Sequence, residues 1–394
     1  KPPALSMYGD EMGYAIQEVF EKSYPSYLAS YSSYPDSHKV AQAILKCKTP
    51  LMGGNQAICQ DCGTSHTHYN SCRNRHCPCC QAINKEKWID ARKADVVDAP
   101  YFHAVFTVPY ELNNLMFSNK RALYNLLYQS TAETLKALAS DKRHLGADIG
   151  FISILHTWGS NLSYHPHIHV IVLGGGLSKE QQFISKKTGF LFPAQVVSKL
   201  FKGKFLEGLK LLYDQGQLII PFSDVMLQYK SEFNKFYTFL NEKNWVIHIK
   251  ETFKGAANVI NYLGRYTHNI AISNSRILKH TPESVTFKVK DYKTGQPSTL
   301  TLDSKEFIRR FLMHVLPRGF VRIRHYGILS NRSKRIKMAI VRTLIGGTDF
   351  KPKFKDMTTL EILKELYGIN PKICKECGGT NIKNITLMSM PKLE

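Results

Sequence analysis

The chain has 394 residues, enough for about two or three domains with cores of their own. It carries 53 Lys and Arg against 31 Asp and Glu, a formal net charge of +22 at pH 7. This surplus favours nucleic acid as a partner, because each cation beside a phosphate releases condensed counterions. We find no apolar run long enough to cross a bilayer and no secretory signal, which disfavours a membrane as the alternative polyanionic surface.

Residues 1–95 form a Cys-rich and Tyr-rich opening, in which seven of the nine cysteines lie between Cys47 and Cys80. Clustered C-x-x-C pairs indicate metal binding in a reducing compartment rather than a disulfide framework. Two such pairs separated by a short loop are typical of a tetrahedral structural zinc site. We predict that this zinc is held by Cys59, Cys62, Cys77 and Cys80.

The cysteines that remain predict a second zinc site in the same segment. Cys72 and His76 are spaced so that one helical turn brings both side chains to one ion, and Cys47 lies upstream. Further ligands are left open, and the candidates are His66, His68 and Cys79.

Strands and helices of an α+β region follow this opening. The aromatic and β-branched run 101–108 predicts a strand, and apolar residues at helical spacing predict a helix over 119–139. Two more strands are predicted over 151–158 and 167–173, joined by a connection of hairpin length.

The strongest chemical signal is a His-x-His pair at the start of the strand 167–173. His167 and His169 share one face of that strand, since side chains two apart point the same way. An isolated pair of this kind is more often a surface turn, but the apolar residues 170–173 place this strand in a core. We therefore predict a divalent metal site, with His156 on the preceding strand as third ligand. The alternatives for the third ligand are His103 and His165.

A strand over 244–250 and a helix from Gly255 to His268 are predicted next, and this helix carries a pair of tyrosines. Tyr262 and Tyr266 lie four residues apart, so both hydroxyls project from one helical face. A free tyrosine has a pKa near ~10 and needs a metal or a base to act as a nucleophile. A core-facing aromatic pair is the alternative, but the His-x-His strand and the basic charge favour catalysis.

Beyond residue 279 the chain is basic and less regular. We predict a hairpin from 284–290 and 298–302, a helix over 304–316 and a basic strand over 320–325. Cys374 and Cys377 form half of a zinc ribbon, whose other half the sequence leaves unassigned. The glycine clusters lack the spacing of a phosphate-binding loop, so no nucleotide cofactor is expected.

Four ordered motifs together resemble the bacterial rolling-circle insertion-sequence transposases with an N-terminal zinc-binding domain, the insertion-sequence-ninety-one family, which is related to the Helitrons. They lie at residues 72–78, 165–169, 262–276 and 320–327. The resemblance extends from about Ile44 to Arg335. This chain departs from the family's pattern at Cys79, where relatives often carry a basic residue, and at Asn55, where they commonly carry a histidine.

The resemblance implies a HUH nuclease core, in which a central antiparallel sheet is backed by helices. It assigns the metal motif to His167 and His169, and the paired nucleophiles to Tyr262 and Tyr266. The implied enzyme is a metal-dependent endonuclease and strand transferase that cuts single-stranded DNA through a 5′-phosphotyrosine, with Mg²⁺ or Mn²⁺ as catalytic ion and Zn²⁺ as structural ion. The alternatives are a plasmid relaxase or replication initiator of the HUH type, a non-catalytic zinc-ribbon DNA-binding protein and a His-metal hydrolase.

Three domains are expected, namely a zinc-binding DNA-recognition domain over 1–95, a catalytic domain over 96–278 and a basic α/β C-terminal region over 279–394. The expected partners are single-stranded DNA and transposon ends, and the expected location is the bacterial cytoplasm in association with the nucleoid. Neither a membrane nor a nucleotide cofactor is expected. DNA contacts are predicted for Arg73, Arg75, Arg265 and Arg276.

Overall fold

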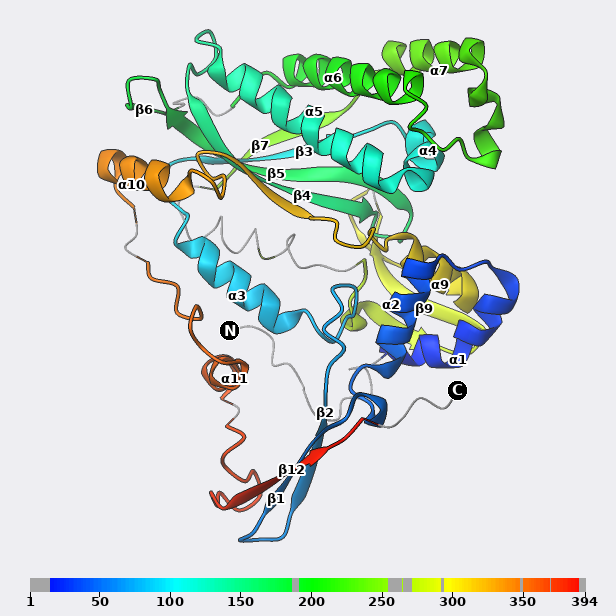
Figure 1. The fold of residues 1–394 in the computed structure, drawn as a ribbon, viewed down its shortest axis with the longest axis vertical. Coiled ribbons are helices and arrows are strands. Elements are labelled where there is room, and N and C mark those ends of the chain that lie inside the picture. The colour runs from blue at the N-terminus through cyan, green and yellow to red at the C-terminus, as the bar shows by residue number, and fades with distance from the viewer. Residues whose placement is uncertain are drawn as a thin grey trace.

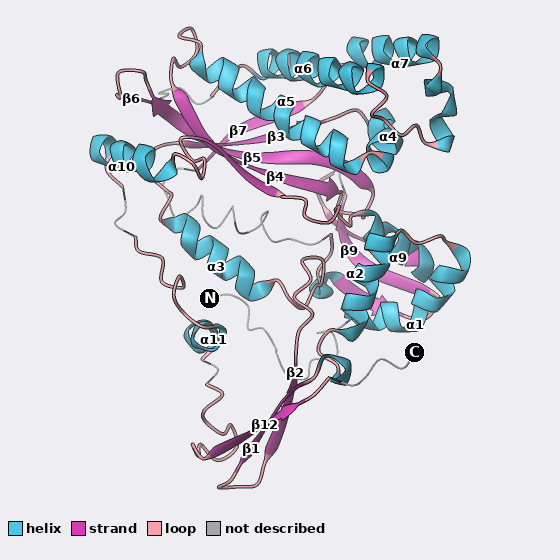
Figure 2. Ribbon diagram, in the orientation of Figure 1, coloured by secondary structure: helices cyan, strands magenta, loops and turns pink. Residues whose placement is uncertain are grey.

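The computed structural model describes residues 15–185, 191–253, 264, 271–291, 294–347, 350–368 and 370–389. A twisted central sheet occupies the middle of the molecule, with helices on both faces (Figures 1 and 2). A smaller helical and sheet unit lies beside it, and a narrow three-stranded arm extends away from both. This arrangement confirms the predicted α+β class with antiparallel sheets backed by helices.

The central sheet has the strand order β11-β4-β5-β3-β7, and β6 pairs with β5. All of these pairings are antiparallel. The sheet therefore contains the strands predicted over 101–108, 151–158, 167–173, 244–250 and 320–325, with shifted bounds for the last two. Its strands are β3 (Tyr101–Thr107), β4 (Asp148–Trp158), β5 (Tyr164–Leu177), β6 (Phe183–Ser185), β7 (Ile247–Phe253) and β11 (Ile323–Gly327).

One face of this sheet is covered by helices that follow β3 and β6 in the chain (Figure 1). Phe106 of β3 meets Phe201 edge-on, with ring centroids 5.1 Å apart. The apolar stripe of the long predicted helix, including Leu123, Leu127 and Leu135, packs into the same core. The helices of this face are α4 (Asn113–Ser118), α5 (Lys120–Ser140), α6 (Ala194–Asp214) and α7 (Lys230–Glu242).

The opposite face is covered by α3 (Ala82–Lys93) and α10 (Lys334–Ile345). Ile152, Ile154 and Ile171 of the sheet pack there with apolar residues of both helices. β4 and β5 are thus buried on both faces, which explains why their sequences are nearly continuous apolar runs instead of alternating ones.

A second core joins the N-terminal helices to residues 271–315. Phe20 of α1 packs edge-on against Phe311 of α9, with ring centroids 5.4 Å apart. The predicted hairpin is present as β9 and β10 and belongs to the same core. Packing therefore crosses both of the predicted domain boundaries. The elements are α1 (Ala15–Ser30), α2 (Pro35–Lys46), β8 (Ile277–His280), β9 (Ser284–Lys290), β10 (Pro297–Asp303) and α9 (Ser304–Met313).

The arm is a three-stranded sheet in the order β12-β1-β2. Its middle strand comes from the N-terminal part of the chain, and antiparallel pairing of Cys59 with Ile382 and of Gly54 with Leu387 brings in a C-terminal strand. The strands are β1 (Gly54–Cys59), β2 (Ser65–Tyr69) and β12 (Ile382–Leu387), and α11 (Thr359–Tyr367) precedes β12.

Short 3-10 helices connect several of these elements. Among the helices that the structure describes, none combines the length and apolar character needed to cross a bilayer. The 3-10 helices are η1 (Pro50–Met52), η2 (Tyr110–Leu112), η3 (Phe222–Gln228) and η4 (Asn274–Arg276).

Candidate active site and metal centres

The hairpin of β4 and β5 brings together the three histidines that the sequence proposes as metal ligands. His156 pairs directly with His167, and His169 lies two residues further along β5 on the same face. One ring nitrogen from each of the three histidines lies within 4.8 Å of those of the other two. All three side chains are buried, with 5% of His156 and 9% of each of the other two exposed.

Hydrogen bonds orient two of these rings so that their Nε2 atoms face each other. His167 donates from Nδ1 to the carbonyl oxygen of His165 at 2.6 Å, which leaves the Nε2 lone pair available. The Nε2 atoms of His167 and His169 are 3.1 Å apart. Two imidazole nitrogens this close are at the spacing of ligands that share one cation.

His103 supports His169 from behind. Its Nε2 lies 2.8 Å from Nδ1 of His169, the nitrogen that points away from the triplet, and the two rings stack with centroids 5.1 Å apart. His103 and His165 were the alternative third ligands. Among the described residues, the ring nitrogens that lie within 4.8 Å of one another belong to His156, His167 and His169, so neither alternative is in this cluster.

Burial favours the neutral form of His103, His167 and His169 by lowering the pKa of each. Loss of solvation lowers the pKa of His167 and of His103 to about 4. The pKa of His169 is held well below its ordinary value by burial and then by the neighbouring His156 and His167. Neutral imidazole is the form that binds a metal ion, so the lowered pKa values favour cation binding at this site.

Both predicted nucleophiles, Tyr262 and Tyr266, and the predicted DNA contact Arg265 lie outside the described residues. Gly264, between the two tyrosines, is described, and it is helical and buried. A Cβ added to it would lie 2.7 Å from Cδ1 of Ile89, on α3. The middle of the tyrosine motif therefore packs on the helix that covers the histidine-bearing face of the sheet.

A first cysteine cluster lies at the C-terminal end of α2. The Sγ atoms of Cys47 and Cys80 are 3.4 Å apart, and those of Cys72 and Cys80 are 3.6 Å apart. Tetrahedral coordination with Zn–S bonds of about 2.3 Å gives S–S edges of about 3.8 Å, close to these values. The four members are Cys47, Cys72, Cys77 and Cys80.

His76 is absent from this cluster, although the sequence proposes it as a ligand beside Cys47 and Cys72. Its Nε2 accepts a hydrogen bond from the backbone N–H of Leu316 at 3.4 Å, and burial lowers its pKa to about 3. Cys77 and Cys80 complete the cluster in its place, because the loop after Cys72 turns back on itself.

A second cluster contains the other two cysteines of the predicted zinc set. Cys59 Sγ lies 3.6 Å from Cys377 Sγ, and Cys62 Sγ lies 3.7 Å from Cys374 Sγ. The predicted set of Cys59, Cys62, Cys77 and Cys80 is therefore divided between two clusters. The pairing of β1 with β12 causes this division, since it brings Cys374 and Cys377 beside Cys59 and Cys62.

The described arginines of the predicted DNA contacts differ in their surroundings. Arg75 donates to the carbonyl oxygens of Phe320 and Pro317, at 2.6 and 3.1 Å. Arg276 donates to the carbonyl oxygens of Lys288 and Ser160. These two guanidinium groups brace the backbone, although Arg75 is exposed, as is Arg73.

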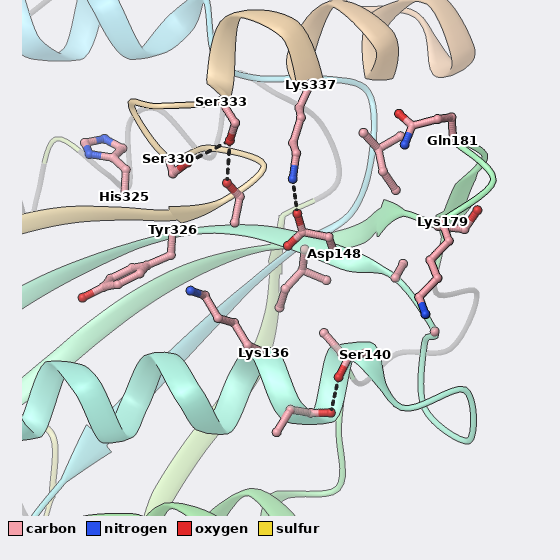
Figure 3. Close-up of a pocket in the computed structure, with 18 residues that line it drawn as sticks. Lys136, Ser140, Asp148, Lys179, Gln181, His325, Tyr326, Ser330, Ser333 and Lys337 are labelled. Atoms are coloured by element: carbon pink, nitrogen blue, oxygen red, sulfur yellow. Dashed lines mark hydrogen bonds and ion pairs between the residues drawn. The ribbon is translucent and has the colours of Figure 1, made fainter.

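A basic cavity of about 700 Å³ lies at the other end of β4 (Figure 3). Lys136 and Lys179 line it, and Lys337 forms an ion pair with Asp148 at its centre. Asp148 is eight residues from His156, which corresponds to about 26 Å along an extended strand. None of the three clustered histidines lines this cavity.

Comparison with known proteins gives two family matches and two close relatives. The family described as "Putative transposase" matches residues 150–337, and the family described as "Transposase zinc-binding domain" matches residues 19–108. The chain is 43% identical over 338 residues to a protein of Sinorhizobium fredii named "Putative transposase y4qJ", and the match covers 85% of each chain. It is 30% identical over 293 residues to the transposase for insertion sequence element IS801 of Pseudomonas savastanoi pv. phaseolicola, covering 73% of this chain and 69% of the relative. No solved structure matches the chain.

Proposed function

The chain belongs to the insertion-sequence-ninety-one family of transposases, and from this we propose that it cuts and rejoins single-stranded DNA through a covalent phosphotyrosine. The observation that carries the proposal is the buried triplet of His156, His167 and His169. Imidazoles at this spacing suit a catalytic divalent cation, and Gly264 of the tyrosine motif packs against the helix on the same face of the sheet.

In the proposed reaction, a hydroxyl of Tyr262 or Tyr266 attacks the scissile phosphorus. A bond forms between the tyrosine oxygen and phosphorus, the bond from phosphorus to the 3′ oxygen breaks, and a free 3′-OH remains. A cation bound to the histidines would polarise the phosphate oxygens. Imidazole ligands suit Mn²⁺, and Mg²⁺ is the more available ion in cells. The covalent link conserves the phosphodiester energy, so rejoining needs no nucleotide.

In this proposal, the zinc-binding domain binds the structural metal ion. Its family match over residues 19–108 contains every member of the first cluster, and we assign the zinc of the domain to that cluster. Two other features support a DNA substrate, namely the net charge of +22 and the lysine-lined cavity beside α10. Exposed Arg73 remains the candidate phosphate contact of the zinc segment.

The test is a covalent trapping assay. Labelled single-stranded oligonucleotides tiling the DNA on either side of the gene are incubated with the protein and Mn²⁺, then separated in SDS. We expect an SDS-resistant adduct from the native chain and none from the Tyr262→Phe/Tyr266→Phe double variant, because each change keeps the ring and removes the attacking oxygen. Each single variant should fold and bind DNA but fail in complete strand transfer. The matched control is Tyr229→Phe, at a tyrosine that is 63% exposed.

The outcomes separate the alternatives. An adduct that persists in the double variant contradicts the assignment of the nucleophiles. Metal-dependent cutting without any adduct identifies a hydrolase, and binding without cutting identifies a DNA-binding protein. A fully active single variant means that its tyrosine is a packing residue and that one nucleophile is enough.

A further inference from the structure

We propose that Cys59, Cys62, Cys374 and Cys377 form a second tetrathiolate zinc centre, which fastens the C-terminal end of the chain to the zinc-binding domain. The two C-terminal cysteines lie outside both family matches, which end at residues 108 and 337. This centre is separate from the one assigned to the first cluster and takes no part in the proposed strand transfer.

The first argument is that the two halves of the cluster have the same local structure. Each half is a C-x-x-C-Gly turn, and the glycine has a positive φ of +76° at Gly63 and +73° at Gly378. Each glycine donates its N–H to the carbonyl oxygen of the first cysteine of its turn, at 2.9 and 3.0 Å. Only glycine adopts this left-handed conformation without strain, and the turn directs both of its sulfur atoms to one side.

The second argument is the arrangement of the four sulfur atoms. The cysteines of one turn face those of the other across 3.6 and 3.7 Å, close to the edge of about 3.8 Å expected for a zinc tetrathiolate. The backbone N–H of Gly379 donates to Cys377 Sγ at 3.4 Å, as an outer hydrogen bond to a metal-bound thiolate would. The chemistry of the donor set therefore suits Zn²⁺ rather than Mg²⁺ or Mn²⁺.

The third argument is that burial of apolar surface does not account for the arm. The only buried residues in β1 are Gly54 and Cys59, and β2 and β12 have none. No described residue of these strands belongs to any of the three hydrophobic cores. A sheet of three short strands without a core is marginal in water, so a metal cross-link is the stabilising element that fits.

The segment from Phe354 to Cys377 is attached at both of its ends, and the proposed centre is the second attachment. Near its start, the backbone N–H of Phe354 donates to the buried carboxylate of Asp90 on α3 at 2.8 Å, and Lys87 donates to the carbonyl oxygen of Met357. Near its other end, Cys374 and Cys377 meet the β1–β2 turn. Zinc binding would therefore fix the segment between α3 and the arm.

The experiment measures thiolate-bound metal in the full-length chain. Zinc content is determined by mass spectrometry of the metal, and Co²⁺ substitution reports thiolate ligands through sulfur-to-cobalt charge-transfer absorption, to which the histidine triplet does not contribute. The native chain should show two tetrathiolate centres. Cys374→Ser/Cys377→Ser should lose one of them, about half of the charge-transfer absorption, while keeping the first cluster. Cys377→His, which retains a ligand, should keep two centres.

The matched control is Cys79→Ser, because Cys79 belongs to neither cluster among the described residues. This variant should keep both centres. A protease should release the C-terminal segment from the double variant and not from the control. Unchanged zinc content and protection in the double variant would overturn the proposal. The proposal would also be overturned if the native chain held no zinc at these cysteines and its mass were lower by four hydrogens, because that result indicates two disulfide bonds.

Discussion

At the scale of single residues, four histidines divide into two roles. His156, His167 and His169 turn nitrogen atoms toward a common point, and His103 holds the far nitrogen of His169. Loss of a ligand removes a bond to the ion, whereas loss of the His103 ring leaves the ligand in place but no longer fixes its orientation. Substitutions at the two kinds of position should therefore have different effects.

Alanine at a ligand position should abolish cleavage. We expect His156→Ala, His167→Ala and His169→Ala each to give no adduct and to bind single-stranded DNA within about threefold of the native affinity, because affinity depends mainly on phosphate contacts elsewhere. The trapping assay and a filter-binding titration measure the two properties. Unchanged cleavage in His156→Ala would transfer the role of third ligand to His103 or His165.

Alanine at His103 should weaken metal binding without abolishing catalysis. The Mn²⁺ concentration for half-maximal cleavage should rise about 10- to 100-fold, and saturating Mn²⁺ should restore most of the rate. His165→Ala is the control, since His165 contributes its backbone carbonyl oxygen to the site and should leave the Mn²⁺ dependence unchanged. If His103→Ala stays inactive at every Mn²⁺ concentration, His103 is a ligand.

At the scale of elements, α3 contacts two segments that are distant from it in the sequence. Ile89 meets Gly264 on one side, and Asp90 holds the C-terminal segment. The position of α3 therefore bears on where the tyrosine motif lies.

A larger side chain at Gly264 should displace the tyrosine motif from α3. Overpacking costs about 1–3 kcal/mol, and we expect Gly264→Val to slow adduct formation about tenfold or more. Ile89→Ala in the same chain should restore much of the rate, because it removes the atoms that the new Cβ meets.

The control for this pair is Gly203→Val on α6, where nothing lies within 4 Å of an added Cβ. It makes the same change in helix propensity and should leave the rate unchanged. Independent, additive effects of Gly264→Val and Ile89→Ala in a double-mutant cycle would show that the two residues are not in contact.

At the scale of the whole molecule, the chain buries many histidines in the neutral state. Loss of solvation lowers the pKa of each, to about 3 or 4, below the value near 6.5 of an unfolded histidine. Between these values the unfolded chain binds more protons than the folded one, so the free energy of unfolding falls as the pH falls. The residues are His76, His103, His167, His314 and His325.

We therefore expect the melting temperature to be highest above about pH 6.5 and to fall steadily toward about pH 4. Calorimetry without added Mn²⁺ measures this dependence. Replacing one of these residues, as in His314→Gln, should lower the number of protons taken up on unfolding by up to one. A melting temperature that is constant between about pH 7 and about pH 5 would contradict this account.

Local patterns in the sequence determined much of the catalytic region. The strands around 101–108, 151–158 and 167–173 are apolar runs bounded by turn residues, and each is present in the central sheet. The period of two along a strand placed His167 and His169 on one face before any fold was known. Eight helices of the described residues were not predicted, namely α1, α2, α3, α4, α6, α7, α10 and α11. The helix predicted from Gly255 to His268 is described only at Gly264.

Only the tertiary structure decided which distant residues meet. The pairing of β1 with β12 divided the predicted cysteine set, and the packing of α1 on α9 joined segments almost 300 residues apart in one core. The register of β4 on β5 placed His156 beside His167 and His169, and the register of β3 left His103 behind them. Strand pairing and burial join residues that are far apart in the chain, so spacing along the sequence carries no record of them.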